Sequence, residues 1–247
     1  MKKLGYLVLV GACAMAIALA GCSGGAASSS SAESESSATE SSSTAITGGW
    51  AFTPLDEINL DSDAQKVFES ATADSNAGKY TPVAVLATQL VAGTNYAFLC
   101  QTDANAWDIV AVYQDLQGKA SVLSDQAIDI AEVKTDALDR DGGDEELVGG
   151  WEVVMPEAPA VLPEDAWVAF DTAAQAYAND KGLDLIPVAS LGSQVVSGTN
   201  YRILCAGQES ASKPATSLYV VDVYAPLQGD PEFTSVNYFD LLSYINQ

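Results

Sequence analysis

The feature that most constrains the fold of this chain is an internal repeat. Three motifs occur twice, in the same order, and the two occurrences of each motif lie roughly 100 residues apart. The pairs are Gly48-Gly49-Trp50 and Gly149-Gly150-Trp151, QLVAGTNY from Gln89 and QVVSGTNY from Gln194, and VYQDLQG from Val112 and VYAPLQG from Val223. The repeat therefore predicts two copies of one small domain, each large enough to bury a modest core of its own.

Each copy begins with a pattern that is typical of a helix. In the second copy Pro163 and the acidic residues after it form a first-turn signature, apolar residues recur at helical spacing over 167–177, and Gly182 ends the pattern. The first copy has a shorter pattern of the same kind, with Asp61 or Ser62 as its N-cap. We expect one helix in each copy.

The sequence after the first helix is typical of strands. Runs of β-branched and aromatic residues are separated by short Gly-containing breaks, and they cover Thr81–Val91, Thr94–Gln101, Trp107–Leu116 and Ala120–Ile130. A helix followed by a meander of strands predicts an α+β fold, with one helix packed on a four- to five-stranded antiparallel sheet in each copy. Trp50, Trp151 and Trp167 are interpreted as core residues of these elements.

The first 47 residues predict export and anchoring. Lys2 and Lys3 precede a short apolar run that ends in Gly21-Cys22, which indicates a signal peptide over residues 1–21 and resembles a lipobox with Cys22 as the lipidated residue. Residues 22–47 are Ser-rich and contain almost nothing large enough to bury, so we interpret them as a disordered tether. These patterns predict a protein held at the cell membrane by its N-terminal lipid and exposed outside the cytoplasm.

The remaining boundaries follow from the repeat. We expect the first domain over residues 48–132, a linker over 133–148 and the second domain over 149–247. The linker is acidic and contains glycine, so it could be a calcium-binding loop, but its spacing completes no known loop, and a solvated linker is the favoured interpretation.

Charge and residue usage exclude several functions. The chain has 33 Asp and Glu against 10 Lys and Arg, a net charge of −23, so nucleic acid is excluded as a partner. Histidine is absent, and neither a nucleophile paired with a base nor a metal-ligand cluster is present in the sequence. We therefore expect no catalytic activity, no metal and no cofactor. Period-two alternation places Cys100 and Cys205 on the apolar strand face, where we expect buried, unpaired thiols.

The repeated motifs resemble those of the cystatins, and in particular the stefins. Members of that family have a Gly-Gly pair near the start of the domain, a Q-x-V-x-G turn after the long helix, and T-N-Y leading into the next strand. The resemblance covers both copies and implies two tandem cystatin-like domains, each with a five-stranded antiparallel sheet wrapped around one helix. The second hairpin of each copy lacks the Pro-Trp pair of secreted cystatins and has the apolar-plus-Gly form of stefins instead.

The resemblance also implies a binding surface. In that family the Gly-Gly segment, the Q-x-V-x-G turn and a later hairpin form a wedge that occludes the active-site cleft of papain-like cysteine proteases. The corresponding residues here are, in the first copy, Ile46, Gly48, Gly49, Gln89, Val91, Gly93 and Leu116, and, in the second copy, Leu147, Val148, Gly149, Gly150, Gln194, Val196, Gly198 and Leu227. Because glycine lets backbone approach a narrow cleft closely, we expect a bulky residue at Gly93 to weaken binding with little change in stability.

Two functions remain open from the sequence. The first is a cell-surface lipoprotein that inhibits papain-like cysteine proteases reversibly and without covalent chemistry. The alternative is a surface-exposed binding or adhesion module with the same fold and no inhibitory activity.

Overall fold

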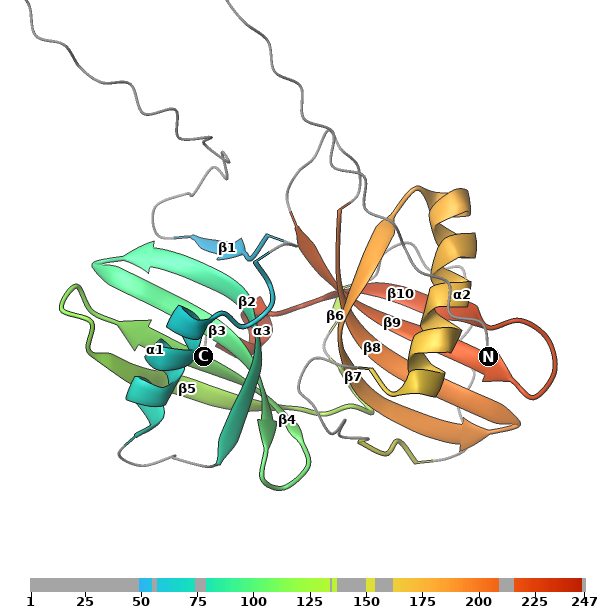
Figure 1. The fold of residues 1–247 in the computed structure, drawn as a ribbon, viewed down its shortest axis with the longest axis horizontal. Helices are drawn as coiled ribbons and strands as arrows, with labels where there is room; N and C mark the ends of the chain where they lie inside the picture. Colours follow the sequence, from blue (N-terminus) through green and yellow to red (C-terminus); the bar gives the residue numbers. More distant parts are fainter. Residues whose placement is uncertain are drawn as a thin grey trace, which may run out of the picture. The chain divides into compact units, whose positions relative to one another are not determined.

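The computed structural model describes residues 49–54, 57–73, 79–133, 135–136, 150–153, 162–208 and 216–245. Its elements, in chain order, are β1 Trp50–Phe52, α1 Ser62–Thr72, β2 Tyr80–Val91, β3 Gly93–Thr102, β4 Trp107–Gln114, β5 Ala120–Ile128, β6 Thr135–Asp136, α2 Glu164–Lys181, β7 Asp184–Val196, β8 Gly198–Gln208, β9 Ser217–Pro226, β10 Glu232–Phe239 and α3 Leu242–Ile245 (Figure 1). Ile46, Gly48, Leu147, Val148, Gly149 and Cys22 lie outside the described residues, as does most of the predicted acidic linker.

Two antiparallel sheets dominate the structure. The first has the order β1-β2-β3-β4-β5, and the second has the order β6-β10-β9-β8-β7. Strand β6 lies inside the segment that the sequence predicted to be linker, and it pairs with the C-terminal end of β10. Each sheet is therefore a meander with one short additional edge strand, β1 or β6.

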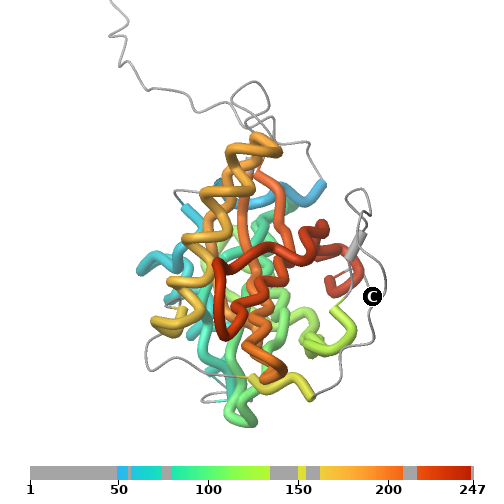
Figure 2. The backbone as a smooth tube through the Cα atoms, turned by 90° about the vertical axis from the view of Figure 1, so that its right-hand side faces the viewer, coloured from blue at the N-terminus to red at the C-terminus, as the bar shows by residue number. Residues whose placement is uncertain are grey.

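Helices α1 and α2 form where their sequence signals predict, whereas the short α3 was not predicted. The carboxylate of Asp61 accepts hydrogen bonds from the backbone N–H groups of Asp63 and Ala64, at 2.9 and 2.7 Å, and so caps α1. Helix α2 ends at Gly182 in a left-handed conformation, with φ of 67°. Helix α2 lies along the second sheet (Figures 1 and 2) and packs mainly against β10, β7 and β9.

Helix α2 packs Phe170, Ala174 and Tyr177 toward its sheet as the helical spacing predicted, but it does not pack Trp167 there. Its buried residues are Ala166, Ala169, Phe170 and Ala173, which form one stripe at helical spacing. Trp167 lies one position outside this stripe and is 48% exposed. The interpretation of Trp167 as a core residue is therefore wrong.

The faces of the two sheets that turn away from the helices are also buried. One hydrophobic cluster contains Leu86, Leu99 and Ile109 of the first sheet together with Leu191 and Leu204 of the second. The indole N–H of Trp107 donates a hydrogen bond of 3.1 Å to the backbone carbonyl of Leu191. The two copies therefore share a core.

The shared core corrects the predicted fold class. The sequence predicted an α+β architecture of two tandem cystatin-like domains, each a helix on a sheet with its own core. This prediction is wrong, because the described chain is mostly antiparallel sheet with few helices, and its two sheets bury residues against each other. The reason is visible in β4, whose residues Trp107 to Val112 are all buried. A run that is apolar on both faces belongs to a sheet covered on both sides, whereas the prediction assumed that one face of each sheet was free.

The prediction for the two cysteines is confirmed. Cys100 and Cys205 are unpaired and fully buried, and each lies in the cluster between its sheet and that sheet's helix. Burial raises the pKa of both thiols well above the ordinary value. Neither thiol is therefore suited to act as a nucleophile.

Candidate binding rims

Three segments of the first copy meet at one end of the first sheet, which we call the first rim. It consists of Gly49-Trp50, the β2–β3 turn at residues 90–93 and the β4–β5 turn at residues 115–118. The strand register brings these segments together, because Trp50 pairs with Gln89, Thr94 with Gln114, and Gln114 with Ala120. The described residues of the predicted site in this copy thus lie at one edge.

The β2–β3 turn of the first rim is held rigidly. Gly93 has φ of 128°, a conformation that favours glycine. A Cβ atom at this position would overlap the carbonyl oxygen of Gln114. The hydroxyl group of Tyr113 donates a hydrogen bond of 2.6 Å to the carbonyl of Ala92, at the tip of the turn. The expectation that a bulky residue at Gly93 would leave stability unchanged is therefore wrong.

The β4–β5 turn is held by a side chain. The carboxylate of Asp115 accepts hydrogen bonds from the backbone N–H groups of Gln117 and Lys119, both at 2.9 Å. This arrangement is an Asx-type turn. It leaves Leu116 projecting from the turn, with 78% of the residue exposed.

The first rim exposes three apolar side chains. Leu90, Val91 and Leu116 are 57%, 40% and 78% exposed, respectively, and all three lie on the two turns. Gln89 is half-buried and accepts a hydrogen bond of 2.6 Å from the side chain of Asn95. The structure therefore gives Gln89 the role of holding the β2–β3 hairpin, and it leaves the outward contact to its apolar neighbours.

The second copy repeats this arrangement at the end of the second sheet, where the β7–β8 turn and the β9–β10 turn form the second rim. Gly198 has φ of 136°, and the hydroxyl group of Tyr224 donates a hydrogen bond of 2.7 Å to the carbonyl of Ser197. Val195 and Leu227 are 78% and 82% exposed. The two rims therefore share the tyrosine hydrogen bond that holds the first of their turns, and both expose apolar residues.

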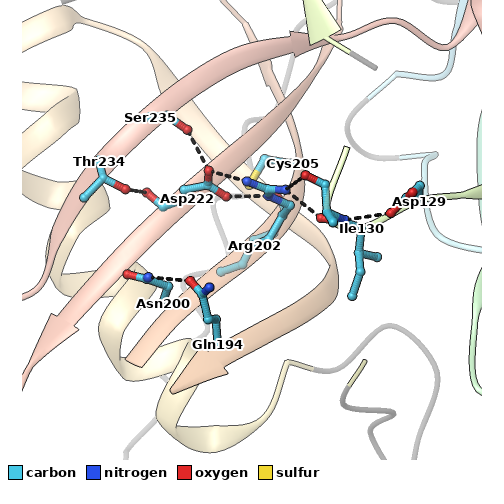
Figure 3. Close-up of polar contacts among 11 residues, drawn as sticks. Asp129, Ile130, Gln194, Asn200, Arg202, Cys205, Asp222, Thr234 and Ser235 are labelled. Carbon is cyan, nitrogen blue, oxygen red and sulfur yellow. Dashed lines mark hydrogen bonds and ion pairs between the residues drawn. The ribbon is translucent and has the colours of Figure 1, made fainter. Parts of the chain in front are cut away.

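In the second copy, the segment around Gly150 and the side chain of Gln194 do not both have the contact role that was predicted for them. Gly150 is exposed, and the nearby Glu152 makes an isolated bridge with Ser193 of β7. Gln194 is only 1% exposed and accepts a hydrogen bond of 2.9 Å from the side chain of Asn200 (Figure 3). Val196 is half-buried. Of the described second-copy residues predicted for contact, Leu227 and Gly150 are exposed, and Leu227 has an exposed fraction of 82%.

Sequence reasoning missed four rim residues. Leu90 and Val195 carry much of the exposed apolar surface, and Tyr113 and Tyr224 hold the turns in both copies. The tyrosines had a signal in the sequence, because the Val-Tyr pair recurs in both copies of the third motif. The exposed leucine and valine had none beyond their position beside the Q-x-V-x-G motif.

The second sheet also carries an ion pair that the first sheet lacks. The guanidinium of Arg202 forms two hydrogen bonds with the carboxylate of Asp222, at 2.7 and 2.8 Å, and one of 2.6 Å with the carbonyl of Ile130 (Figure 3). The ring of Trp151 lies 4.3 Å from the guanidinium carbon. Since Ile130 follows the last strand of the first sheet, Arg202 connects the two copies.

The described ranges contain neither a metal site nor a membrane-spanning helix. No group of three His, Cys, Asp or Glu side chains there is placed to hold a metal ion. No helix in that part of the chain is both long and apolar enough to cross a membrane. Neither a scan of protein-family models nor a comparison with curated proteins matches this chain.

Proposed function

We propose that the protein inhibits papain-like cysteine proteases by placing the first rim in the active-site cleft. The observation that supports this proposal is the convergence of three motif segments at one end of the first sheet, with Leu90, Val91 and Leu116 exposed there. These are the segments to which the resemblance to cystatins assigns the inhibitory wedge. Inhibition by occlusion is compatible with a chain that lacks histidine.

Rigid turns favour this mode of binding. The hydrogen bonds of Tyr113 and Asp115 hold the two tips of the first rim in place before any partner arrives. Because little loop entropy is lost on binding, more of the contact energy is available as affinity. The apolar tips supply that contact energy, since a protease cleft is a concave surface with hydrophobic subsites.

An inhibition assay tests the proposal. The exported chain from Ser23 onward should inhibit papain reversibly and remain intact by mass, because the rim only occludes the cleft. The variant Leu116→Asp should inhibit about tenfold less well or worse, since a central anchor whose loss costs about 2 kcal/mol changes affinity by more than tenfold. Leu123→Asp is the matched control, because Leu123 is 55% exposed on β5 and lies outside the rim.

Two outcomes contradict the proposal. The first is that the protein at high micromolar concentration leaves papain and cathepsin-type enzymes fully active. The second is that Leu123→Asp weakens inhibition as much as Leu116→Asp does. The first result favours the alternative, a surface binding module without inhibitory activity, whereas the second shows that inhibition does not depend on the first rim.

The proposed location of this activity is the outer face of the cell membrane, with Cys22 as the lipid-bearing N-terminus. The supporting pattern is the sequence Leu19-Ala20-Gly21-Cys22 at the end of the apolar run. The variant Cys22→Ala should leave the detergent phase and enter the aqueous phase on phase separation. An unmodified Cys22 in the mass spectrum of the native protein contradicts this assignment.

A further inference from the structure

The N-terminal turns of α1 and α2 correspond residue by residue. Both helices place a buried phenylalanine against their sheet, Phe68 in α1 and Phe170 in α2. When these residues are aligned, Asp63 corresponds to Asp165. The same alignment places Lys66 of α1 where α2 has Val168.

In the first copy the aspartate has a cation from its own helix. The ammonium group of Lys66 lies 2.8 Å from the carboxylate of Asp63. This contact lowers the pKa of Asp63 and raises the pKa of Lys66, in each case chiefly through the hydrogen bond between them. The positive charge at this place in the fold is thus supplied internally.

In the second copy the corresponding place is a hollow. Val168 stands where α1 has the lysine, and it lines an open pocket of about 560 Å³ together with Asp165. The walls of the pocket include the apolar residues Val168, Ala225 and Pro231, and its charged groups are the carboxylates of Glu164 and Asp165. No lysine or arginine lines it among the residues that the structure describes.

The Asp165 carboxylate is held in a fixed orientation at this hollow. One of its oxygens accepts a hydrogen bond of 2.9 Å from the hydroxyl group of Tyr201, and the other accepts one of 3.0 Å from the backbone N–H of Ala166. Burial, followed by the neighbouring carboxylate, raises the pKa of Tyr201 to about 12. The phenol therefore keeps its proton and donates to Asp165 throughout the physiological range.

We propose that this hollow binds a lysine or arginine side chain of a partner protein. Such a side chain has an aliphatic stem that fits the apolar walls and a cationic head that fits the carboxylates of Glu164 and Asp165. The two acidic residues also stabilise the N-terminus of α2 through the helix dipole. That role accounts for their charge, but it accounts neither for the open hollow beside them nor for the difference from the first copy, where Lys66 pairs with Asp63.

The position of the hollow fits a protein partner. Ala225 and Pro231 flank the β9–β10 turn, which carries Leu227 of the second rim. Trp167 and Val168, 48% and 58% exposed, add apolar surface beside the hollow. A partner that covers the second rim can therefore insert a basic side chain into the hollow, a contact that the first copy does not offer.

The test uses a blocked tripeptide, acetyl-Ala-Lys-Ala-amide, and the same peptide with its lysine acetylated on Nε. The exported chain is titrated with each peptide while backbone amide shifts are followed by NMR. The lysine peptide should shift the signals of Val168, Ala169 and Ala225. The acetylated peptide should bind about fivefold less well, the factor that corresponds to an exposed ion pair of roughly 1 kcal/mol.

The variant Val168→Lys restores the internal cation of the first copy and should abolish the response to the lysine peptide. Ala176→Lys adds the same charge to an exposed position further along α2 and should leave the response unchanged. Glu164→Gln combined with Asp165→Asn should act like Val168→Lys, and it keeps the test valid if Val168→Lys fails to fold.

Three results overturn the inference. They are equal binding of the two peptides, shifts spread over the acidic surface instead of gathered at the hollow, and an unchanged response in Val168→Lys. No protease enters this experiment, so its outcome is independent of whether the first rim inhibits papain.

Discussion

The two copies have the same rim turns, but the residues around these turns differ. Gly93 and Gly198 have nearly the same backbone conformation, and Tyr113 and Tyr224 lock the two turns in the same way. What differs is the charge nearby. The first copy pairs Asp63 with its own Lys66, whereas the second copy leaves an open acidic hollow.

The same contrast appears in the strands. Ala97 pairs with Ala111 in the first sheet, and the corresponding residues of the second sheet are Arg202 and Asp222. The comparison shows that the two copies share the turns of the rims. They differ in the N-terminal turn of the helix and in the paired strand residues Ala97–Ala111 and Arg202–Asp222. The two copies therefore have the same kind of tip and different neighbouring contacts.

The largest expected effect comes from the core that the copies share. Trp107→Ala should lower the free energy of unfolding by about 3–5 kcal/mol, the usual cost of truncating a buried tryptophan. Since the indole also bonds to Leu191, hydrogen exchange should speed up in both sheets. Trp167→Ala, at an exposed position, is the control and should change stability little. Faster exchange confined to the first sheet would show that the copies fold independently.

The ion pair of the second sheet should show the next largest effect. Arg202→Ala leaves Asp222 mostly buried without its cation, so we expect a loss of about 2–3 kcal/mol, below the 3–5 kcal/mol of fully buried pairs. The double variant Arg202→Ala with Asp222→Ala recreates the alanine pair of the first sheet and should regain part of that loss. Urea unfolding of the three proteins measures both values, and a double variant that is less stable than Arg202→Ala would refute this explanation.

The glycines at corresponding positions of the two rims should have similar effects on stability when they are replaced. Gly93→Ala and Gly198→Ala should each cost about 1–3 kcal/mol, because both positions have positive φ and little room for a Cβ atom. Gly118→Ala is the matched control, since its φ is also positive but nothing lies within 4 Å of the added atom. Thermal unfolding should show the smallest loss of stability for Gly118→Ala. Any other order means that crowding around the added Cβ atom does not decide the loss of stability.

The smallest effect concerns pH. The pKa of Tyr201 is raised to about 12, above the ordinary value of 10, so the folded state holds this proton more tightly than the unfolded state does. Its contribution is fully present below pH 10 and is lost as the pH rises from 10 to 12. Tyr201→Phe should therefore lose less stability over this interval than the parent protein does. Identical curves for Tyr201→Phe and the parent would contradict the assignment.

Local structure could be predicted from the sequence because its signals are local. The caps at Asp61 and Gly182 and the glycine breaks gave the helices and the strands of the first copy within a few residues. The packing of the copies could not be predicted in the same way. A strand such as β4 has the same sequence whether its second face meets solvent or another sheet, and only its continuous apolar run from Ile109 to Val112 indicated the second case.

The candidate site was predictable only in part, for a similar reason. The motif placed the turns, and the register of the sheet brought them together. Which side chains point outward depends on the turn geometry, so Gln89 and Gln194, which the motif includes, make hydrogen bonds within their hairpins. The hollow beside α2 required the pairing of Tyr201 with Asp165, 36 residues apart in sequence.

The most direct test of the central claim compares the two rims in one assay. Inhibition constants for papain are measured with the exported chain, with Leu116→Asp and with Leu227→Asp, which carry the same change at corresponding positions of the first and second rims. The proposal predicts inhibition by the parent and by Leu227→Asp, together with a loss of about tenfold or more in Leu116→Asp. Equal inhibition by all three proteins, or no inhibition by the parent at high micromolar concentration, would contradict it.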